Sequence, residues 1–338
     1  MSTAATTLRE NEIRPDHLMR EQAQRFAADI ARILARRSEF VRVPCPACGS
    51  EQSRPAFQKH ALDYVFCTGC ETMFINPRPT PAVLEMYYSS SENYAYWNQH
   101  IFPASEAVRR EKIFRPRAQR VAEICQRYNV PTRTLLEVGA GFGTFCEELR
   151  SLKIFDRLLA VEPTPSLAET CRQRGLEVIE KPIEHADLSG LNADVVASFE
   201  VMEHLFSPGD YVRQCARLLA PGGLFIATCP NIRGFDMVTL GSVSTAVDPE
   251  HLNYFHPDSL SQLVESCGLT VLEVQTPGKL DAELVRKKAL AGEFDLTGQL
   301  FLKQILLDEW ERAGVAFQEF LAANRLSSHM WLVAQKAG

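Results

Sequence analysis

The stretch LLEVGAGFGTF, residues 135–145, restricts the fold of this 338-residue chain more than any other part of its sequence. An apolar run as long as one buried strand passes into Gly139, Gly141 and Gly143, which stand at alternate positions. Glycine adopts backbone conformations that other residues resist, and it lets a ligand come close to the main chain. A glycine-rich turn between a strand and a helix also presents backbone N–H groups to a ligand. The stretch therefore predicts a strand–turn–helix unit with a ligand bound at the turn.

Strand-like runs alternate with helix-compatible segments, such as 143–152 and 165–174, through the rest of the chain. The strand-like runs are TLLEVG, RLLAVE, LEVIE, DVVASF, GLFIATCP, LTVLEVQ (269–275) and HMWLVAQK (329–336). This alternation predicts an α/β fold with a parallel sheet and right-handed crossovers. Residues 277–328 read as helical and are long for a simple connection, so they are predicted to be a helical insertion that covers something.

Two carboxylates indicate which ligand the turn accepts. The dinucleotide fingerprint G-x-G-x-x-G has its third glycine where Thr144 stands here. Glu137 precedes the first glycine, and its charge suits a cofactor with a cationic amino group and a sulfonium better than a pyrophosphate. Glu162 ends the next strand, where a ribose-binding acid belongs, because its two oxygens can accept both ribose hydroxyls.

The segments EVGAGFG and AVEP resemble the class I S-adenosylmethionine-dependent methyltransferases, and the resemblance extends over residues 130–275. DVVASFEVMEHL (194–205) resembles the fourth-strand motif of the branch that includes quinone O-methyltransferases. LLAPGGLFIATCPN (218–231) resembles the helix–turn–strand that follows it in most class I members. The resemblance implies a Rossmann-like, seven-stranded methyltransferase sheet and S-adenosylmethionine as cofactor.

The same resemblance implies a role for each residue of a cofactor site. The glycines would cradle the methionyl and ribose portion, and the acid before them would organise the amino end. The acid after the second strand would hold the ribose hydroxyls, with the adjacent proline beside the adenine. Two residues after the third strand would lie on the adenine side, and two at the end of the fourth would lie nearest the methyl group. In chain order these residues are Glu137, Gly139, Gly141, Gly143, Glu162, Pro163, Ile183, Glu184, Phe199 and Glu200.

Two CxxC pairs, CPAC and CTGC, place Cys45, Cys48, Cys67 and Cys70 with 18 residues between the pairs. This spacing is a strong signal for Zn²⁺, and four thiolates complete a tetrahedral site with no open position, which is typical of a structural metal. The alternative is two redox or incidental pairs. Zinc ribbons often bind nucleic acid, but no basic run accompanies this one, which favours a scaffolding or substrate-facing role.

The chain is predicted to contain five segments. They are an N-terminal helix (1–40), a small zinc ribbon (41–78), an aromatic and helical lid and linker (79–130), an S-adenosylmethionine-binding domain (131–276), and a helical insertion with a closing strand (277–338). In the lid, Tyr88, Tyr94 and Trp97 either cover the site or are simply part of a core.

Charge and hydropathy restrict the partners of the chain. The net charge of −6 argues against a nucleic-acid partner. One basic stretch, 105–120, is either a solvated helix face or a contact for a phosphate-bearing small-molecule substrate. Apolar runs are too short to span a membrane, and the N-terminus lacks the apolar core of a signal peptide, so a cytoplasmic location is expected.

A zinc ribbon before the sheet and an extension after it resemble sugar C-methyltransferases, whose E-H-x-x-Y-[FY] segment is matched by EHLNYF (250–255). This resemblance implies a sugar, nucleotide-sugar, or polysaccharide or natural-product precursor as substrate. The quinone-type segment FEVMEHL instead favours O-methylation of a quinone-like or other secondary metabolite, so carbon and oxygen acceptors both stay open. A non-catalytic interaction protein that retains the cofactor fold is the competing interpretation.

Two histidines are candidates for the base that prepares the acceptor. His251 follows Glu250, which could orient the imidazole only from a turn, and VDPEH favours such a turn. His204 follows the fourth strand closely enough to reach the cofactor crevice. Histidine suits this role because it is largely neutral near pH 7, and the alternative is that neither ring acts as a base.

Overall fold

The computed structural model describes residues 8–338, which form two compact units. Of the described residues, 8–105, 230–259 and 275–330 form the ribbon unit, and Glu106–Cys229, Leu260–Val274 and Trp331–Gly338 form the sheet unit. The chain thus passes between the units several times, and the contiguous segment 131–276 contributes to both. Residues 1–7 of the predicted N-terminal segment lie outside the described residues.

The sheet unit is built on seven strands, hydrogen-bonded in the order β10-β11-β8-β7-β4-β5-β6. The strands are β4 (Thr134–Val138), β5 (Arg157–Val161), β6 (Glu177–Ile179), β7 (Ala193–Phe199), β8 (Leu219–Pro230), β10 (Leu269–Gln275) and β11 (His329–Lys336). The pairs β4–β5, β4–β7, β5–β6 and β7–β8 are parallel. The predicted Rossmann-like α/β sheet is therefore confirmed, including a last strand supplied by the C-terminal end of the sequence.

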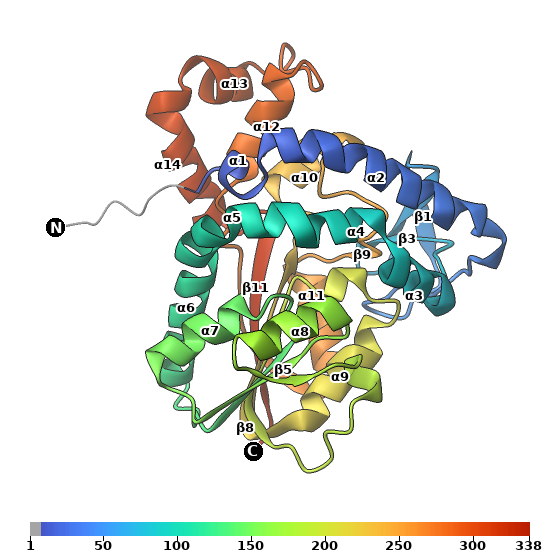
Figure 1. Cartoon of the computed structure of the whole chain (residues 1–338). Coiled ribbons are helices and arrows are strands. Elements are labelled where there is room, and N and C mark those ends of the chain that lie inside the picture. The colour runs from blue at the N-terminus through green and yellow to red at the C-terminus, as the bar shows by residue number, and fades with distance from the viewer. Residues whose placement is uncertain (1–7) are drawn as a thin grey trace. The chain divides into compact units, whose positions relative to one another are not determined.

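Helices lie on both sides of this sheet, as Figure 1 shows. They are α6 (Arg115–Arg127), α7 (Thr144–Leu152), α8 (Pro165–Gln173), α9 (Pro208–Leu218) and α11 (Pro257–Ser266). Because a central parallel strand is covered on both faces, every residue of β7 is buried. The core gathers side chains from β4 and β7, such as Leu135 and Val195, with those of α6 and α7, such as Val121 and Phe145.

The strand order fixes where a ligand can bind. β4 lies between β5 and β7, so the chain leaves β4 towards one side of the sheet and later returns on its other side. In open α/β sheets, ligands bind outside the carboxyl ends of the strands at such a switch point. The turn of three glycines, Glu162 and Phe199 all stand at carboxyl ends of these three strands.

The ribbon unit contains an antiparallel sheet of order β1-β2-β3-β9, formed by β1 (Ser53–Lys59), β2 (Leu62–Cys67), β3 (Met73–Ile75) and β9 (Asn253–Tyr254). Val41 and Arg78 form an isolated antiparallel β-bridge, so the two ends of the segment 41–78 lie side by side. The last strand comes from the EHLNYF segment, with Met73 paired to Tyr254 and Phe74 to Asn253. The candidate zinc ribbon therefore shares a sheet with the strand that follows the candidate base His251.

The helices of the ribbon unit come from both ends of the chain. They are α1 (Glu10–Ile13), α2 (Asp16–Ala35), α3 (Pro81–Ser90), α4 (Glu92–Tyr96), α5 (Phe102–Arg109, which extends into the sheet unit), α10 (Phe235–Leu240), α12 (Asp281–Leu290), α13 (Leu300–Lys303) and α14 (Trp310–Ala323). The last three lie within residues 277–328 and contribute to a core around Val285, Leu306 and Leu321. Within residues 8–338, no helix is both long enough and apolar enough to cross a membrane.

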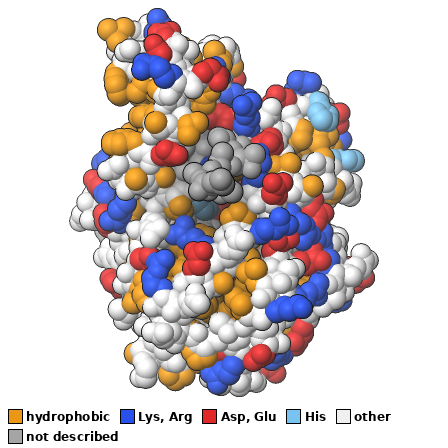
Figure 2. Space-filling view, turned by 90° about the vertical axis from the view of Figure 1, so that its left-hand side faces the viewer, with side chains coloured by type: hydrophobic (Ala, Val, Ile, Leu, Met, Phe, Trp, Pro, Cys, Tyr) orange, Lys and Arg blue, Asp and Glu red, His pale blue; other side chains and the backbone are white. Residues whose placement is uncertain are grey.

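Charged side chains of both signs are intermixed on the face drawn in Figure 2. This distribution agrees with the modest negative charge of the sequence, in which 36 basic residues stand against 42 acidic ones.

Candidate functional site

The turn after β4 needs glycine at each alternate position. Gly139, Gly141 and Gly143 all have left-handed backbones, with φ of +82°, +55° and +71°. A Cβ at Gly139 would lie 2.6 Å from Cγ2 of Val201, and one at Gly143 would lie 2.5 Å from Cδ1 of Leu176. At Gly141 a Cβ would meet nothing within 4 Å. Packing therefore requires the outer glycines, whereas the middle one leaves the backbone open to a ligand.

Glu162 joins this turn to the second strand. Its Oε2 accepts a hydrogen bond from the Gly141 N–H (2.8 Å), and its Oε1 accepts one from the Thr164 N–H (2.9 Å). The carboxylate is 4% exposed, and burial raises its pKa although both backbone donors oppose the shift. A carboxylate has about four lone-pair sites, so each oxygen can still accept a ribose hydroxyl.

Three further predicted residues follow β5 and β6. Pro163 is exposed beside Glu162. Ile183 is buried at the start of the short 3₁₀ turn Ile183–His185, and Glu184 in the same turn is exposed. Ile183 is therefore a buried apolar side chain and Glu184 a solvent-facing acid, and their place beside the adenine stays a prediction.

Glu137 is a buried carboxyl group with one neutral hydrogen-bond donor. Cys146 Sγ donates to its Oε2 at 3.0 Å, and the side chain is 3% exposed. Burial raises the pKa of Glu137 to about 8, against the opposing effects of Cys146 and Arg117. The group therefore keeps its proton near pH 7 unless a cation approaches it.

Arg117 is a candidate site residue that the sequence analysis missed. It lies on α6, with its guanidinium carbon 4.4 Å from the ring centroid of Phe199. Burial lowers the pKa of Arg117, while the negative charges of Glu200 and Glu137 oppose that shift. One cation thus acts on two acids that the sequence assigned to the cofactor. The only signal in the sequence was its place in the basic stretch 105–120.

Other cations of that stretch are held by ion pairs within the sheet unit. Arg110 contacts Glu147 at 2.7 Å and Glu148 at 2.9 Å, and Arg115 contacts Glu148 at 2.9 Å. These bonds fasten the chain before α6 to α7. The contact with a phosphate-bearing substrate stays a prediction.

Phe199 ends the strand β7, and Glu200 follows it in an unusual conformation. Phe199 packs against Phe145 and Trp331, with ring centroids 4.8 Å and 5.6 Å away. Glu200 has a left-handed backbone (φ +56°), and its Oε1 accepts from Thr228 Oγ1 at 2.5 Å. A non-glycine residue in this region costs about 1–3 kcal/mol and is common at functional sites. His204 follows in the short turn Met202–His204 and is partly buried.

The predicted turn before His251 exists in the ribbon unit. Asp248 Oδ1 accepts hydrogen bonds from the N–H groups of Glu250 (2.8 Å) and His251 (2.9 Å). The imidazole Nδ1 lies 2.9 Å from the Ala246 carbonyl oxygen and 3.5 Å from Asp248 Oδ2. A proton on Nδ1 donated to the carbonyl makes Nε2 the basic nitrogen of the neutral ring. Asp248 and Ala246, which the sequence analysis did not single out, thus orient the ring.

Glu250 extends a polar network towards α3 and α4. Its Oε1 accepts from Asn93 Nδ2 at 2.8 Å and from the Tyr87 hydroxyl. Asp29 in turn accepts from the Asn93 N–H at 2.9 Å and from Ser91 Oγ at 2.6 Å. Burial and the Asp248 charge raise the pKa of Glu250 to about 7. We call residues 244–256, which carry His251, the histidine loop. The carboxyl group of Glu250 therefore connects the histidine loop to the aromatic segment that the sequence assigned to a lid.

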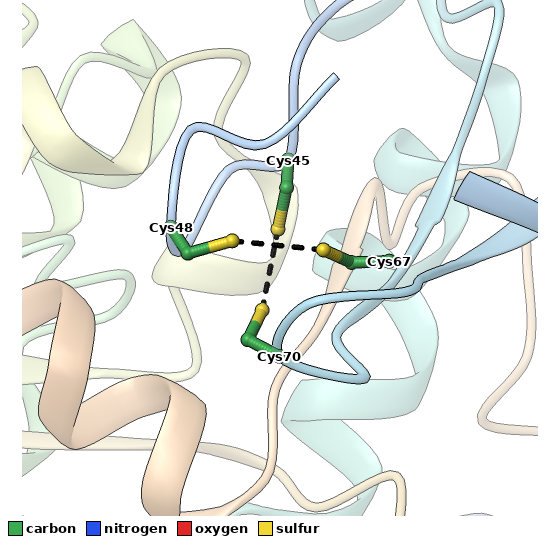
Figure 3. Close-up of side chains that lie close together, drawn as sticks. All are labelled: Cys45, Cys48, Cys67 and Cys70. Atoms are coloured by element: carbon green, nitrogen blue, oxygen red, sulfur yellow. Dashed lines mark hydrogen bonds between the residues drawn. The ribbon is translucent and has the colours of Figure 1, made fainter. Parts of the chain in front are cut away.

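The four cysteines converge on one point in the ribbon unit, as Figure 3 shows. The Sγ atoms of Cys45 and Cys70 are 3.5 Å apart and those of Cys48 and Cys67 are 3.6 Å apart, and all four lie within 4.8 Å of one another. With Zn–S bonds of about 2.3 Å, a tetrahedral site has sulfur–sulfur distances of about 3.8 Å. The donor set therefore fits a zinc ion.

Hydrogen bonds at the cluster affect its thiols unequally. The Gly69 N–H donates to Cys67 Sγ at 3.3 Å, and the bond between Cys45 and Cys70 lowers the pKa of Cys70 while it raises the pKa of Cys45. The ring of His256 hydrogen-bonds the Cys70 carbonyl at 2.7 Å, which fastens the second knuckle to the segment after β9. All ten cysteines of the chain are free of disulfides.

Residues 108–274 match the sequence model of a family described as a methyltransferase domain. A protein of Mycolicibacterium smegmatis described as an S-adenosylmethionine-dependent methyltransferase is 28% identical over 158 residues, which cover 45% of this chain and 56% of the relative. A ubiquinone biosynthesis O-methyltransferase of a Caulobacter species is 36% identical over 104 residues, or 29% of this chain and 40% of the relative. The chain thus spans about half the length of the curated relatives it matches.

The fold also matches a solved structure. The plantazolicin methyltransferase BpumL, in complex with SAH, superposes with a TM-score of 0.50 over 75% of this chain and 94% of that one, at 13% identity. This likeness concerns the arrangement of the sheet and its helices.

The buried carboxyl group of Glu137 makes the stability of the fold depend on pH. Its pKa of about 8 in the folded chain exceeds its ordinary value of 4.5. Between pH 4.5 and about 8, the folded chain therefore holds a proton on this carboxyl group that the unfolded chain has lost. The stability that this proton supports is complete below pH 4.5 and is lost as the pH rises through about 8. Urea unfolding between pH 5 and 9 should show wild type losing stability relative to Glu137→Gln as the pH rises. The exposed substitution Glu169→Gln serves as control, and a constant difference between wild type and Glu137→Gln would contradict this account.

Proposed function

Because the chain carries a class I S-adenosylmethionine-dependent methyltransferase domain, we propose that the whole protein transfers a methyl group from this cofactor to a small molecule. The observation that carries the proposal is the open space above Gly141, bounded by a carboxylate that the same N–H group holds in place. Bound S-adenosylmethionine supplies an electrophilic methyl group on a sulfonium. The chain has to bind the cofactor, orient the acceptor and exclude water.

The residues around the turn would hold the cofactor through complementary charge. Glu162 would accept the ribose hydroxyls, with Pro163 and Ile183 beside the adenine. Glu137 would pair with the amino group, and this cation would release the proton that burial now keeps on the carboxyl. Arg117, acting on Glu137 and Glu200, would neutralise the cofactor's carboxylate end. Phe199 and Glu200 would lie nearest the methyl group, where the strained end of β7 fixes them.

A structural Zn²⁺ in the four-cysteine cluster is the second part of the proposal. Four thiolates fill a tetrahedral site, so the metal would have no position for a water or a substrate. It would hold together a small antiparallel sheet whose last strand belongs to the histidine loop. Its function would therefore be to shape that loop.

The acceptor would be a small molecule with a hydroxyl or an acidic C–H. The EHLNYF segment supports a sugar, nucleotide-sugar, or polysaccharide or natural-product precursor, which would include phosphate-bearing substrates. The Caulobacter relative supports the second candidate, O-methylation of a quinone-like phenol. A mass screen of nucleotide-sugars and catechol-type phenols, incubated with the protein and S-adenosylmethionine, distinguishes the two by which one gains a methyl group. Cofactor binding without any methylated product would favour the non-catalytic interpretation.

His251 would serve as the base that prepares this acceptor. Its Nδ1 is fixed by the Ala246 carbonyl, which gives the ring one orientation and one basic nitrogen. The network from Glu250 to Asn93 and Asp29 would hold the loop in place. The aromatic segment of this network, with the C-terminal helices, would exclude water as a lid. His204 is the alternative base.

Two glycines with the same kind of backbone, one in the turn after β4 and one outside it, test whether the cofactor binds at this turn. Gly141→Val should abolish binding, because the side chain would occupy the open space above the turn. Gly222 also has a left-handed backbone (φ +75°), and a Cβ added there would meet nothing within 4 Å, so Gly222→Val is a matched control that should bind normally. Glu162→Ala should weaken binding at least about tenfold, because it removes charge-assisted hydrogen bonds. Titration calorimetry measures all three, and unchanged affinity in Gly141→Val and Glu162→Ala would place the cofactor elsewhere.

Metal content tests the cysteine cluster. The purified protein should contain about one zinc per chain by elemental analysis, and Cys67→Ser should lose it because three thiolates close the site incompletely. Cys125→Ser, at a buried thiol in the core of the sheet unit, should retain the metal. Full zinc content in Cys67→Ser would refute the site.

Substitution of His251 should separate chemistry from cofactor binding. With the acceptor found in the mass screen, His251→Ala should lower kcat by roughly 10²–10⁴ and leave the affinity for S-adenosylmethionine nearly unchanged. The exposed His17 on α2 provides the control His17→Ala, which should retain full activity. Near-normal turnover in His251→Ala would remove this residue from the mechanism, and His204→Ala would then identify or exclude the alternative base.

A further inference from the structure

Arg78 is a charged side chain that the fold of the ribbon unit buries completely. It ends the segment 41–78 and is 0% exposed. Its Nε donates to the Ile75 carbonyl oxygen at 3.2 Å, and its Nη2 donates to the Leu252 carbonyl oxygen at 3.4 Å. The guanidinium carbon lies 5.7 Å from the ring centroid of Phe74. Moving a charge out of water is costly unless hydrogen bonds and opposite charge compensate for it, so the surroundings of this cation have to stabilise it.

Backbone pairing brings this cation close to the first cysteine knuckle. The Val41 N–H donates to the Arg78 carbonyl oxygen at 3.0 Å, and the Arg78 N–H donates to the Val41 carbonyl oxygen at 2.9 Å. The Asn76 side chain holds Val43 in a similar way, because it accepts from the Val43 N–H at 3.1 Å and donates to the Val43 carbonyl oxygen at 3.2 Å. Cys45 follows two residues later. The chain that leads into the cysteine cluster therefore runs beside Arg78.

The charges of the cluster and of Arg78 are complementary. Four thiolates around one Zn²⁺ leave an excess of two negative charges. Cys45 and Cys67 are buried, so water screens this excess only weakly. Burial lowers the pKa of Arg78 to about 10, and the negative charge of a Cys45 thiolate opposes that shift. Each charge thus reduces the cost of burying the other.

We propose that Arg78 is the counter-ion of the zinc–thiolate cluster. This inference rests on the structural Zn²⁺ proposed above. A guanidinium is not a metal ligand, but its charge stabilises the thiolates that hold the metal, as groups outside the ligand shell do at other metal sites. The same guanidinium bonds the carbonyl group of Leu252, which directly follows His251. Arg78 therefore also connects the charge of the cluster to the histidine loop.

A purely structural role for Arg78 makes a different prediction. If the side chain only satisfied the carbonyl groups of Ile75 and Leu252, the planar fork of its donors would matter and its charge would not. Lysine keeps the charge but cannot reproduce that fork, whereas methionine keeps much of the volume without the charge. Arg78→Lys and Arg78→Met would then be equally harmful. If the cluster requires the charge, only Arg78→Met is harmful.

The zinc affinity of the full chain, measured by competition with a chromophoric chelator at neutral pH, distinguishes the two roles. Arg78→Met should lower this affinity at least about tenfold, and Arg78→Lys should stay within about threefold of the wild type. Arg54 offers a matched control, because its guanidinium carbon lies 4.8 Å from the ring centroid of Phe66 in the same sheet, but it is exposed. Arg54→Met should stay within about threefold of the wild type, since water and salt screen an exposed charge.

Cobalt substitution gives a second readout that reports on charge at the thiolates. In the Co²⁺-loaded protein, the thiolate-to-cobalt charge-transfer band should move to longer wavelength in Arg78→Met, because loss of a nearby cation raises the energy of the thiolate electrons. The band should keep its position in Arg78→Lys and in Arg54→Met. Arg78→Gln, a second neutral variant that still offers a donor, should show the same weakening and the same shift as Arg78→Met. Circular dichroism of each variant checks that the fold is retained.

Three outcomes would overturn the proposal. The first is an Arg78→Lys protein that loses zinc affinity as strongly as the neutral variants, which would assign a structural role to the donor fork. The second is a folded neutral variant with unchanged zinc affinity and an unmoved band. Both of these leave the metal site itself intact. The third is a wild type that contains no zinc, which would refute the metal site as well. None of these results depends on methyl transfer.

Discussion

The hydrogen bond from the Gly141 N–H to the Glu162 carboxylate is the interaction on which the rest of the candidate site depends. It joins the first turn of the sheet unit to the end of the next strand, so the two segments that would bind one ligand keep a fixed separation. The bond is possible only because the middle of the turn adopts a left-handed backbone, which brings the amide of Gly141 towards the acid. The outer glycines make this geometry available, since a side chain at either would collide with Val201 or Leu176. This buried carboxylate thus holds the turn in place, and its remaining lone pairs could accept hydrogen bonds from a ligand.

A second constraint follows from charge in a low-dielectric environment. Glu137 is buried without a permanent cation in contact, and burial favours its protonated form. Arg117 is partly buried above an aromatic ring, and burial disfavours its charged form. Each group makes the other's charge less costly, and a zwitterionic ligand would do the same for both. A zwitterionic ligand would therefore offset part of the cost of burying these two charges, and a ligand with another charge pattern would not.

The sequence was sufficient for those features that depend on local patterns. Alternating strands and helices predicted the sheet, including its last strand from residues 329–336, and the two CxxC pairs predicted four thiols at one point. Features that depend on contacts between distant positions were not accessible. Arg117 acquires its role from Phe199, and Glu250 is held by Tyr87 and Asn93, so nothing in the local sequence of either residue reveals it. Asp248 was overlooked because an acid before a proline is typical of any turn, whereas its two hydrogen bonds to the loop appear only in the structure.

The pairing of β3 with β9 has a consequence for how such a chain can be recombined. The cysteine ribbon and the histidine loop are separated by more than 150 positions in sequence, yet Phe74 and Asn253 are partners in one sheet, and His256 bonds the carbonyl of Cys70. A chimera that exchanges residues 41–78 alone would leave an edge strand without its partner and would displace the loop. Residues 41–78 and 244–256 therefore form one structural unit, although they lie far apart in the sequence. Exchange of the loop that carries His251 between related proteins therefore requires both pieces to move together.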